Sequence, residues 1–263
     1  MKKAAGVNSS GAPSHFAKER QQQIAEALKQ QGRVVVATLA VEYGVSEDSI
    51  RRDLRILAAN GLIQRAHGGA VALNPTMMSA ANRDGVFAGT KQAIAAAALR
   101  HIRPDQTLFL DSGTTVLALA RLIRAGAAPR PLTVVTASFD TAGALIDDPQ
   151  IRLVLAGGAL LRESRSFEGD TALATVASYR ADVAFLSACA LSPRAGLTAV
   201  QSGDAQLKRA MVEGSVRRIV ITDQSKLDAV APHAVCGLDE IDLVICDAAP
   251  SWKGAARLEF ETV

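Results

Sequence analysis

The sequence predicts a small N-terminal domain of helices with a hairpin, followed by a larger α/β domain with a mostly parallel sheet. Short amphipathic segments separated by turn glycines occupy residues 1–73. From Lys91 onward, apolar strand-like runs alternate with helical stretches, which is typical of a parallel sheet covered by helices. A length of 263 residues and a hydrophobic content of 49% allow two globular domains of these sizes.

The composition argues against several classes of protein. No apolar run approaches the roughly 18 residues that a membrane span requires. The charged start has no apolar stretch behind it, so it does not read as a signal peptide. Cys189, Cys236 and Cys246 lie far apart, and the four histidines are scattered without metal-ligand spacing. We expect a cytoplasmic protein with no membrane partner, no metal and no cofactor.

Positive charge is concentrated at the N-terminal end of the chain. Residues 1–73 contain ten Lys and Arg and six Asp and Glu, whereas the remainder contains nineteen and twenty. A basic excess confined to one quarter of the chain indicates that this quarter contacts a polyanion.

Three helices are expected in the N-terminal domain. The first spans Lys18–Gln30, where apolar residues recur at helical spacing. A short segment of β-branched residues then precedes Thr38. Thr38 is expected to cap a second helix from Leu39 to Tyr43. Gly44 supplies a left-handed turn, and Ser46 opens the third helix.

The third helix has an apolar side and a basic side. Its apolar positions are Ile50, Leu54 and Leu57, and its basic positions are Arg51, Arg52 and Arg55. This pattern suits a DNA recognition helix, because the apolar side docks on a core while guanidinium groups reach phosphates and guanine edges. For an isolated helix, a solvated charged face is the alternative.

A hairpin after the third helix completes the pattern. Two extended runs within Leu62–Val71 meet at a tight turn, and together with the preceding helices they predict a winged helix-turn-helix. Arg65 and His67 would approach the DNA backbone or minor groove, although His67 is equally well read as a turn residue with local hydrogen bonds. The predicted DNA contacts are Thr38, Ser46, Ser49, Arg51, Arg52, Arg55, Arg65 and His67.

These motifs resemble a known family. The run Arg20–Val71 resembles the N-terminal domain of DeoR-type bacterial transcriptional regulators. The segment Val45–Leu54 matches that family's recognition-helix signature, with Ser49 where Thr is more usual, and Gly61–Ile63 and Arg65–Ala70 match its wing. The resemblance implies that this domain binds DNA.

The alternation of segments predicts the domain bounds and the elements of the C-terminal part. We expect a disordered tail at 1–15, the DNA-binding domain at 16–73, a linker at 74–88, an effector domain at 89–250 and a C-terminal segment at 251–263. Strands are expected at Thr107–Leu110, Leu132–Val135, Ile151–Leu155, Val183–Ser187, Arg218–Ile221 and Asp242–Cys246. Helices are expected at Lys91–His101, Val116–Arg124, Phe139–Ile146, Thr171–Tyr179 and Ala205–Val216.

Polar or glycine-rich loops follow the strands, where ligands of parallel sheets bind. The loop Asp111–Thr115 has a turn glycine, hydroxyls and a helix start, which suits a phosphate cradle. Taken alone, it is more simply a capped helix start; convergence with later loops favours a site. The candidates are Asp111, Ser112, Gly113, Thr114, Thr115, Thr136, Ser138, Gly157, Gly158, Lys208, Asp223 and Lys226.

Three of these candidates have competing interpretations. Lys208 suits a cation against a phosphate or sugar oxygen, and its alternative is an ordinary solvated lysine, as it is for Lys226. Asp111 suits an acceptor for sugar hydroxyls or a loop organiser better than an acid catalyst.

The C-terminal part also resembles the DeoR family's effector domain, so the resemblance covers about residues 18–250. That domain is similar in fold to ribose-5-phosphate isomerase and glucosamine-6-phosphate deaminase, and the resemblance implies a sensor for a phosphorylated sugar. Ala137 stands where the family usually has Asn, and Ser187 where it usually has Gly. These departures should alter which hydroxyl groups are recognised.

We therefore expect a nucleoid-associated transcriptional regulator, not an enzyme, that represses a carbohydrate-metabolism operon. Its expected partners are double-stranded operator DNA, a phosphorylated sugar, and further copies of itself in a dimer or tetramer. The alternative is a sugar-phosphate isomerase or deaminase with an appended DNA-binding domain; such an enzyme would need a positioned carboxylate base.

Overall fold

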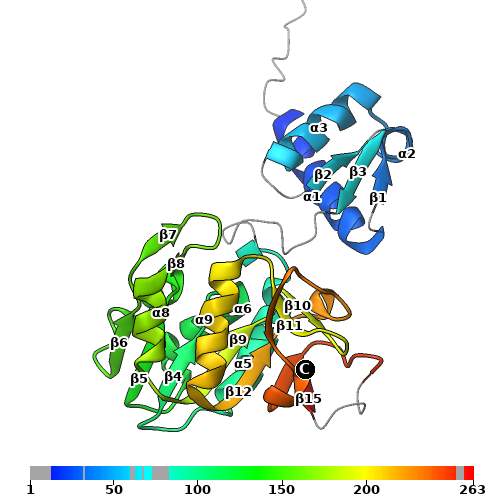
Figure 1. Ribbon diagram of the computed structural model, residues 1–263. Coiled ribbons are helices and arrows are strands. Elements are labelled where there is room, and N and C mark those ends of the chain that lie inside the picture. Colours follow the sequence, from blue (N-terminus) through cyan, green and yellow to red (C-terminus); the bar gives the residue numbers. More distant parts are fainter. Residues whose placement is uncertain (1–12, 32, 60–62, 67, 73–82, 253–257) are drawn as a thin grey trace, which may run out of the picture. The chain divides into compact units, whose positions relative to one another are not determined.

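The computed structural model describes residues 13–31, 33–59, 63–66, 68–72, 83–252 and 258–263 (Figure 1). Contacts divide the chain into two units, Met1–Met78 and Ser79–Val263, and each is described by itself. Among the described helices, none is long and apolar enough to cross a membrane.

Unit 1 is a winged helix-turn-helix, as predicted. Its elements are α1 (Pro13–Gln31), β1 (Arg33–Val35), α2 (Val36–Glu42), α3 (Glu47–Ala59), β2 (Ile63–Ala66) and β3 (Gly69–Ala72). The three strands form an antiparallel sheet in the order β1-β3-β2. The apolar side of α3 is buried with residues of α1 and α2, including Ile24, Leu28 and Leu39. Gly44 has a φ of 63°, the left-handed turn that the sequence predicted.

Two details of unit 1 differ from the prediction. The first helix begins at Pro13 rather than Lys18, with proline at the first helical position, where its missing N–H costs nothing. Thr38 does not cap the second helix: α2 begins at Val36, and its N-cap is Val35. The backbone N–H of Val36 donates to the carbonyl of Gly68 at 2.9 Å, so sheet pairing leads directly into the helix without a side-chain cap.

Asp53 is a buried charge that the helical pattern did not reveal. It lies on the packed side of α3 and is 3% exposed. The Nε of Arg20 donates to its Oδ2 at 2.7 Å, and Nε2 of Gln21 donates to its Oδ1 at 2.7 Å. This carboxylate therefore ties α3 to α1 and fixes the orientation of the recognition helix within the unit.

Unit 2 is built on a seven-stranded sheet in the order β15-β14-β12-β9-β4-β5-β6, with every neighbouring pair parallel (Figure 1). The strands are β4 (Thr107–Leu110), β5 (Leu132–Thr136), β6 (Ile151–Leu155), β9 (Ala181–Ser187), β12 (Ser215–Ile221), β14 (Leu243–Cys246) and β15 (Glu259–Thr262). The six predicted strands are all present, and the parallel α/β fold class is confirmed. The seventh strand, β15, was not predicted.

Helices cover both faces of this sheet. They are α5 (Ala88–Leu99), α6 (Thr114–Leu122), α7 (Phe139–Leu145), α8 (Asp170–Ala177) and α9 (Ser202–Glu213). One core joins one face of the sheet to α5, α6 and α7, and a second joins the other face to α8 and α9. Most strands are buried on both faces, which explains why they read as continuous apolar runs.

Unit 2 also contains short antiparallel strands outside the parallel sheet, and the sequence analysis did not predict them. A hairpin consists of β7 (Ala159–Leu161) and β8 (Ser166–Glu168). A second small sheet has the order β10-β11-β13, formed by Ala190–Ser192, Gly196–Ala199 and His233–Cys236. At three or four residues each, these strands are too short to show a period in the sequence.

The segment that joins the units is only partly described. Residues 74–82 of the expected linker and residues 1–12 of the expected tail lie outside the described part of the chain. Nη1 and Nη2 of Arg121 donate to the carboxylate of Asp84 at 3.0 and 2.8 Å. Asp84 was expected in the linker, but this contact holds it to unit 2. The other predicted domain bounds stay predictions.

We predict that Asp53→Asn destabilises unit 1, because it removes the charge that binds Arg20 and Gln21 in a buried position. The expected loss is about 1–3 kcal/mol of unfolding free energy, the range for hydrogen bonds to buried charged groups. Urea unfolding of the full chain, followed by circular dichroism, measures it. The matched control is Asp48→Asn, because Asp48 is also ion-paired on α3 but its side chain is 89% exposed. Equal stability of the two variants would contradict an anchoring role for Asp53.

Candidate functional site

The exposed side of α3 carries the predicted DNA contacts. Arg51, Arg52 and Arg55 are all exposed. Ser46 precedes the helix, and its hydroxyl accepts a hydrogen bond from the backbone N–H of Ser49 at 3.3 Å, so it is the predicted N-cap. Arginine side chains on a helix whose opposite side is buried can reach phosphates and base edges without disturbing the core.

Arg51 is held within its own helix. Its Nη2 lies 2.6 Å from Glu47 Oε2, and its Nη1 lies 3.1 Å from Asp48 Oδ1. All three side chains are largely solvent-accessible, so these pairs are weak and can exchange for a phosphate or a base. A contact of Arg51 with DNA would compete with these two ion pairs.

The remaining predicted DNA contacts lie outside α3. Arg65 is exposed on β2, and Thr38 is exposed in the first turn of α2. His67 lies outside the described residues. The DNA contacts as a group stay predictions.

In unit 2, the strand order marks a switch point. The chain runs from β4 through β5 to β6 in one direction, and β9, β12 and β14 lie on the other side of β4. Ligands of such sheets bind in the crevice beyond the carboxyl ends of the strands at this reversal, here between β4 and β9. Asp111 directly follows β4, and Ser187 ends β9.

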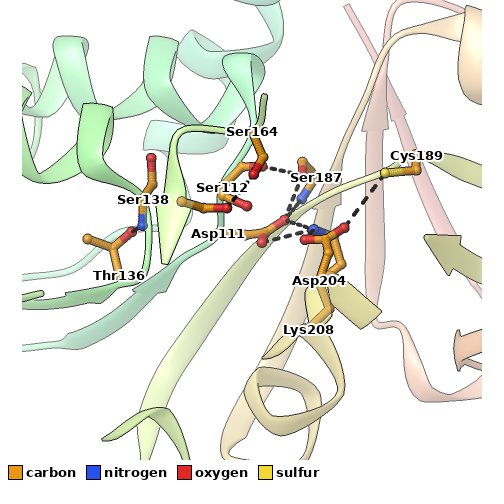
Figure 2. Close-up of polar contacts among 10 residues, drawn as sticks. Asp111, Ser112, Thr136, Ser138, Ser164, Ser187, Cys189, Asp204 and Lys208 are labelled. Carbon is orange, nitrogen blue, oxygen red and sulfur yellow. Dashed lines mark hydrogen bonds and ion pairs between the residues drawn. The ribbon is translucent and has the colours of Figure 1, made fainter. Parts of the chain in front are cut away.

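A buried lysine joins two carboxylates at this switch point (Figure 2). The Nζ of Lys208, on α9, lies 2.8 Å from Asp111 Oδ2 and donates to Asp204 Oδ1 at 2.6 Å. The side chains of Lys208 and Asp111 are 1% and 2% exposed, and that of Asp204 is 20% exposed. We call these three residues the ionic clasp.

Electrostatics in the clasp favours the charged lysine. Burial alone would lower the pKa of Lys208, but Asp111 and Asp204 outweigh it and raise the pKa above the ordinary value. Burial raises the pKa of Asp204, and Lys208 opposes that rise. The Cys189 thiol approaches Asp204 Oδ2 at 3.8 Å, and burial raises the pKa of this thiol.

The clasp changes the roles expected for its members. Lys208 is not a solvated lysine, and its ammonium group already binds two carboxylates. Asp111 is a loop organiser: its Oδ2 also accepts hydrogen bonds from the backbone N–H and hydroxyl of Ser187, at 2.8 and 2.6 Å. Direct contact of Lys208 with an effector phosphate stays a prediction.

Ser187, the departure from Gly noted in the sequence, packs tightly on the loop before α6. A Cβ atom at Gly113 would lie 2.3 Å from the Cβ of Ser187, so only glycine fits there. Gly113 is the N-cap of α6, and Thr114 and Thr115 form its first turn. Ser112 and Thr114 are half-buried at this helix start, where free N–H groups favour an anion.

The loops after β5 and β6 organise the local backbone. The Thr136 hydroxyl accepts from Ser138 N–H at 3.0 Å, and the Ser138 hydroxyl accepts from Thr141 N–H at 3.2 Å, capping α7. A Cβ atom at Gly158 would lie 2.3 Å from the carbonyl oxygen of Glu168, so this glycine allows β7 and β8 to meet; Gly157 has open space around it.

The β7–β8 hairpin adds hydroxyl groups that sequence reasoning missed. Ser166 on β8 is bridged to Ser138, and its hydroxyl lies 2.8 Å from that of Ser164. The bridge places the hairpin beside the loop that follows β5. The hairpin therefore brings serines from a later part of the chain to a loop at the carboxyl ends of the strands.

A group of cations lies near the same strand ends. Lys226 is 7% exposed and Lys91 is 5% exposed. Burial lowers the pKa of both, that of Lys91 to about 8, and Asp223 opposes the shift in each. The Nζ of Lys91 donates to the carbonyl of Arg83, whose guanidinium Nε is buried without a hydrogen-bond partner among the described residues.

Lys91 and Arg83 were missed for different reasons. Arg83 fell in the expected linker. Lys91 lies on the buried side of α5 with Ile94, Ala95 and Ala98, and a lysine on the apolar side of an Ala-rich helix was a usable signal.

Asp223 organises its own loop by accepting a hydrogen bond from the N–H of Ser225 at 3.0 Å. In the described part of the chain, no group of His, Cys, Asp and Glu is suited to hold a metal ion.

Comparison with known proteins identifies both units. A family model described as a DeoR-like helix-turn-helix domain matches residues 20–76, and one described as the DeoR C-terminal sensor domain matches residues 86–248. A putative aga operon transcriptional repressor of Escherichia coli O157:H7 is 34% identical over 93% of this chain and 93% of its own length. The transcriptional repressor GlcR of Bacillus subtilis is 31% identical over 90% of each chain. The glycerol-3-phosphate regulon repressor of Escherichia coli K12 is 30% identical over 88% and 91%.

Among solved structures, ribose 5-phosphate isomerase A from Methanocaldococcus jannaschii aligns with a TM-score of 0.38 and 18% identity, covering 52% of this chain and 53% of that one. This similarity supports no argument about function, and the assignment rests on the sequence matches.

We predict that Lys208→Met strongly destabilises unit 2, because it leaves Asp111 and Asp204 facing each other without a cation. Breaking a buried ion pair in this way costs about 3–5 kcal/mol. Urea unfolding of the full chain measures the loss, and adding Asp204→Asn should restore part of it. A Lys208→Met variant within about 1 kcal/mol of the wild type would show that the clasp is not structural.

Proposed function

Because the chain belongs to the DeoR family of transcriptional regulators, we propose that it represses a carbohydrate-metabolism operon and is released from its operator by a phosphorylated sugar. The observation that carries this proposal is the pairing of a recognition helix, α3, with a polar, cation-lined crevice at the switch point of unit 2. The repressor names of relatives in the aga and glycerol-3-phosphate systems support it.

The DNA-binding part of the proposal rests on α3. Phosphate contacts by Arg and Lys supply affinity, and Arg51, Arg52 and Ser49 are placed to read bases. One winged helix buries little surface on DNA, so tight binding needs at least two copies on paired half-sites. We therefore propose a homo-oligomer.

The effector part rests on the crevice. The helix start at Gly113–Thr115 offers N–H groups and hydroxyls to a phosphate. Arg83, Lys91 and Lys226 supply positive charge beside the β12 strand end, and serine hydroxyls suit the sugar. Binding must favour the state that does not bind DNA, since equal affinity for both states would shift nothing.

The crevice suits binding better than isomerase chemistry. Aldose–ketose proton transfer needs a carboxylate free to accept a proton. The two carboxylates nearest the switch point, Asp111 and Asp204, share the Lys208 ammonium group. We therefore expect no turnover of pentose or hexosamine phosphates.

We predict that Arg52→Ala weakens operator binding by about 1–3 kcal/mol if Arg52 contacts a guanine, and relaxes sequence choice at that base pair. Arg51→Ala should cost less, because DNA competes with Glu47 and Asp48 for the wild-type side chain. Fluorescence anisotropy with a duplex from the chain's own upstream region measures both. Arg162→Ala, at an exposed arginine of unit 2, is the control. Unchanged affinity in both α3 variants would remove α3 from base reading.

We predict that effector response declines as pH rises above about 8, where Lys91 loses its proton. The sign follows from the lowered pKa: Lys91 is charged below about 8 and neutral above it, so its attraction for a phosphate fades there. The measurement is sugar-phosphate-induced release from DNA between pH 7 and 9.5. Lys91→Arg should keep its response at the upper end, and Lys91→Met should bind DNA but respond weakly throughout. Identical pH profiles in wild type and Lys91→Arg would exclude Lys91 from the site.

A further inference from the structure

The parallel sheet of unit 2 ends in two edge strands of different chemistry (Figure 1). The edge strand β15 carries two acidic residues, Glu259 and Glu261, and charge is a common protection against unwanted strand pairing. The opposite edge strand, β6, has the sequence Ile-Arg-Leu-Val-Leu, with one charge among four aliphatic residues. Leu155 at its end is 39% exposed. An aliphatic edge of this kind is a template for another strand.

The outer side of β6 has unpaired backbone groups. The carbonyl of Gln150 accepts from Leu132, and the N–H of Ala156 donates to Thr136, both residues of β5. In a parallel ladder alternate residues face the neighbouring strand, so the even-numbered residues of β6 face β5 and the odd-numbered ones face outward. Among the described residues, the outward groups of Leu153 and Leu155 have no backbone partner.

The helix beside this edge also has an exposed apolar stripe. Phe139, Gly143 and Ile146 lie at i, i+4 and i+7 along α7, which places them on one side of the helix. Phe139 is 48% exposed and Ile146 is 70% exposed, while the space around Gly143 is open. Leu145 of α7 packs in the same core as Ile151, so the stripe and the odd-numbered residues of β6 belong to the same face of the sheet. The guanidinium of Arg165 lies over the Phe139 ring at 5.4 Å, so Ile146 is the more open apolar residue of this stripe.

We propose that β6 pairs with β6 of a second copy of this chain, antiparallel across a two-fold axis at Leu153, so that the two sheets become continuous. In this register Leu153 faces the partner's Leu153, and Leu155 faces the partner's Ile151. The outward N–H and carbonyl of Leu153 and the outward N–H of Leu155 then gain partners, and Leu155 is covered. The N–H of Ile151 keeps its bond to the carbonyl of Asp148 at 3.1 Å. A register centred on Arg152 would instead set two guanidinium groups against each other.

A second copy fits this edge because the pairing is self-complementary. A two-fold interface uses the same patch on both subunits, and the aliphatic row of β6 matches its own reversal about Leu153. The stripe on α7 lies beside the axis in both copies. This inference rests on the proposed function in one respect: binding to paired operator half-sites requires two copies of the chain.

A disulfide tests the register directly. Opposed residues that exchange both hydrogen bonds lie about 5.5 Å apart at Cα, within the range of a disulfide. Leu153→Cys should therefore give a covalent dimer under mild oxidation in the absence of DNA. The copies of residue 155 would be about 13 Å apart, four residues along the strand, so Leu155→Cys should remain monomeric on a non-reducing gel. The wild type, with its own three cysteines, is the background control. A cross-link at Leu155→Cys and none at Leu153→Cys would overturn the register.

Sedimentation equilibrium of the full chain without DNA tests the interface itself. The wild-type chain should have the mass of a dimer. The double variant Ile146→Glu/Leu155→Lys should have half that mass, that of a monomer. Val216→Lys and Val230→Lys, at sites 78% and 62% exposed elsewhere in unit 2, should leave the mass unchanged. A monomeric wild type, or an edge variant that keeps the wild-type mass, would overturn the proposal. Neither experiment involves DNA or effector, so an intact dimer that fails to bind any operator would count against the proposed function alone.

Discussion

The ionic clasp of Asp111, Lys208 and Asp204 is the interaction on which the geometry of unit 2 depends. It joins the end of β4, the start of α9 and, through Ser187, the end of β9 at one point. Both carboxylates share the single ammonium group of Lys208, so neither of them is left without a cationic partner. The loops proposed to face an effector are therefore set by contacts within the chain itself.

The sequence predicted the fold well because its signals are local. Strands buried on both faces are continuous apolar runs, and α3 shows its two sides at helical spacing. Thr38 was misplaced because β1 pairs with β3 and continues directly into α2, a tertiary constraint that no capping rule contains. Strand β15 and the strands of the small antiparallel sheets were missed because each is only three or four residues long, too short to show a period.

The candidate site was only partly predictable. The strand-end loops were visible as polar and glycine-rich breaks, and in the structure those after β4 and β9 are hydrogen-bonded to each other. The partner of a buried charge was not visible: nothing local to Asp111 indicates a lysine 97 residues away. The same holds for Asp53 and Arg20, which are 33 residues apart. Lys91 showed a local anomaly, a charge on an apolar helix side, and could have been found.

We propose that one ligand bound to unit 2 opposes DNA binding by unit 1. Thermodynamic linkage requires the effect to be reciprocal. If the effector weakens operator affinity by a given factor, the operator weakens effector affinity by the same factor. Isothermal titration of a responsive sugar phosphate into the free chain, and into the chain saturated with operator duplex, tests it most directly. We expect a lower effector affinity in the complex with DNA, by the same factor by which the effector lowers operator affinity. Equal affinities in the two titrations would contradict it.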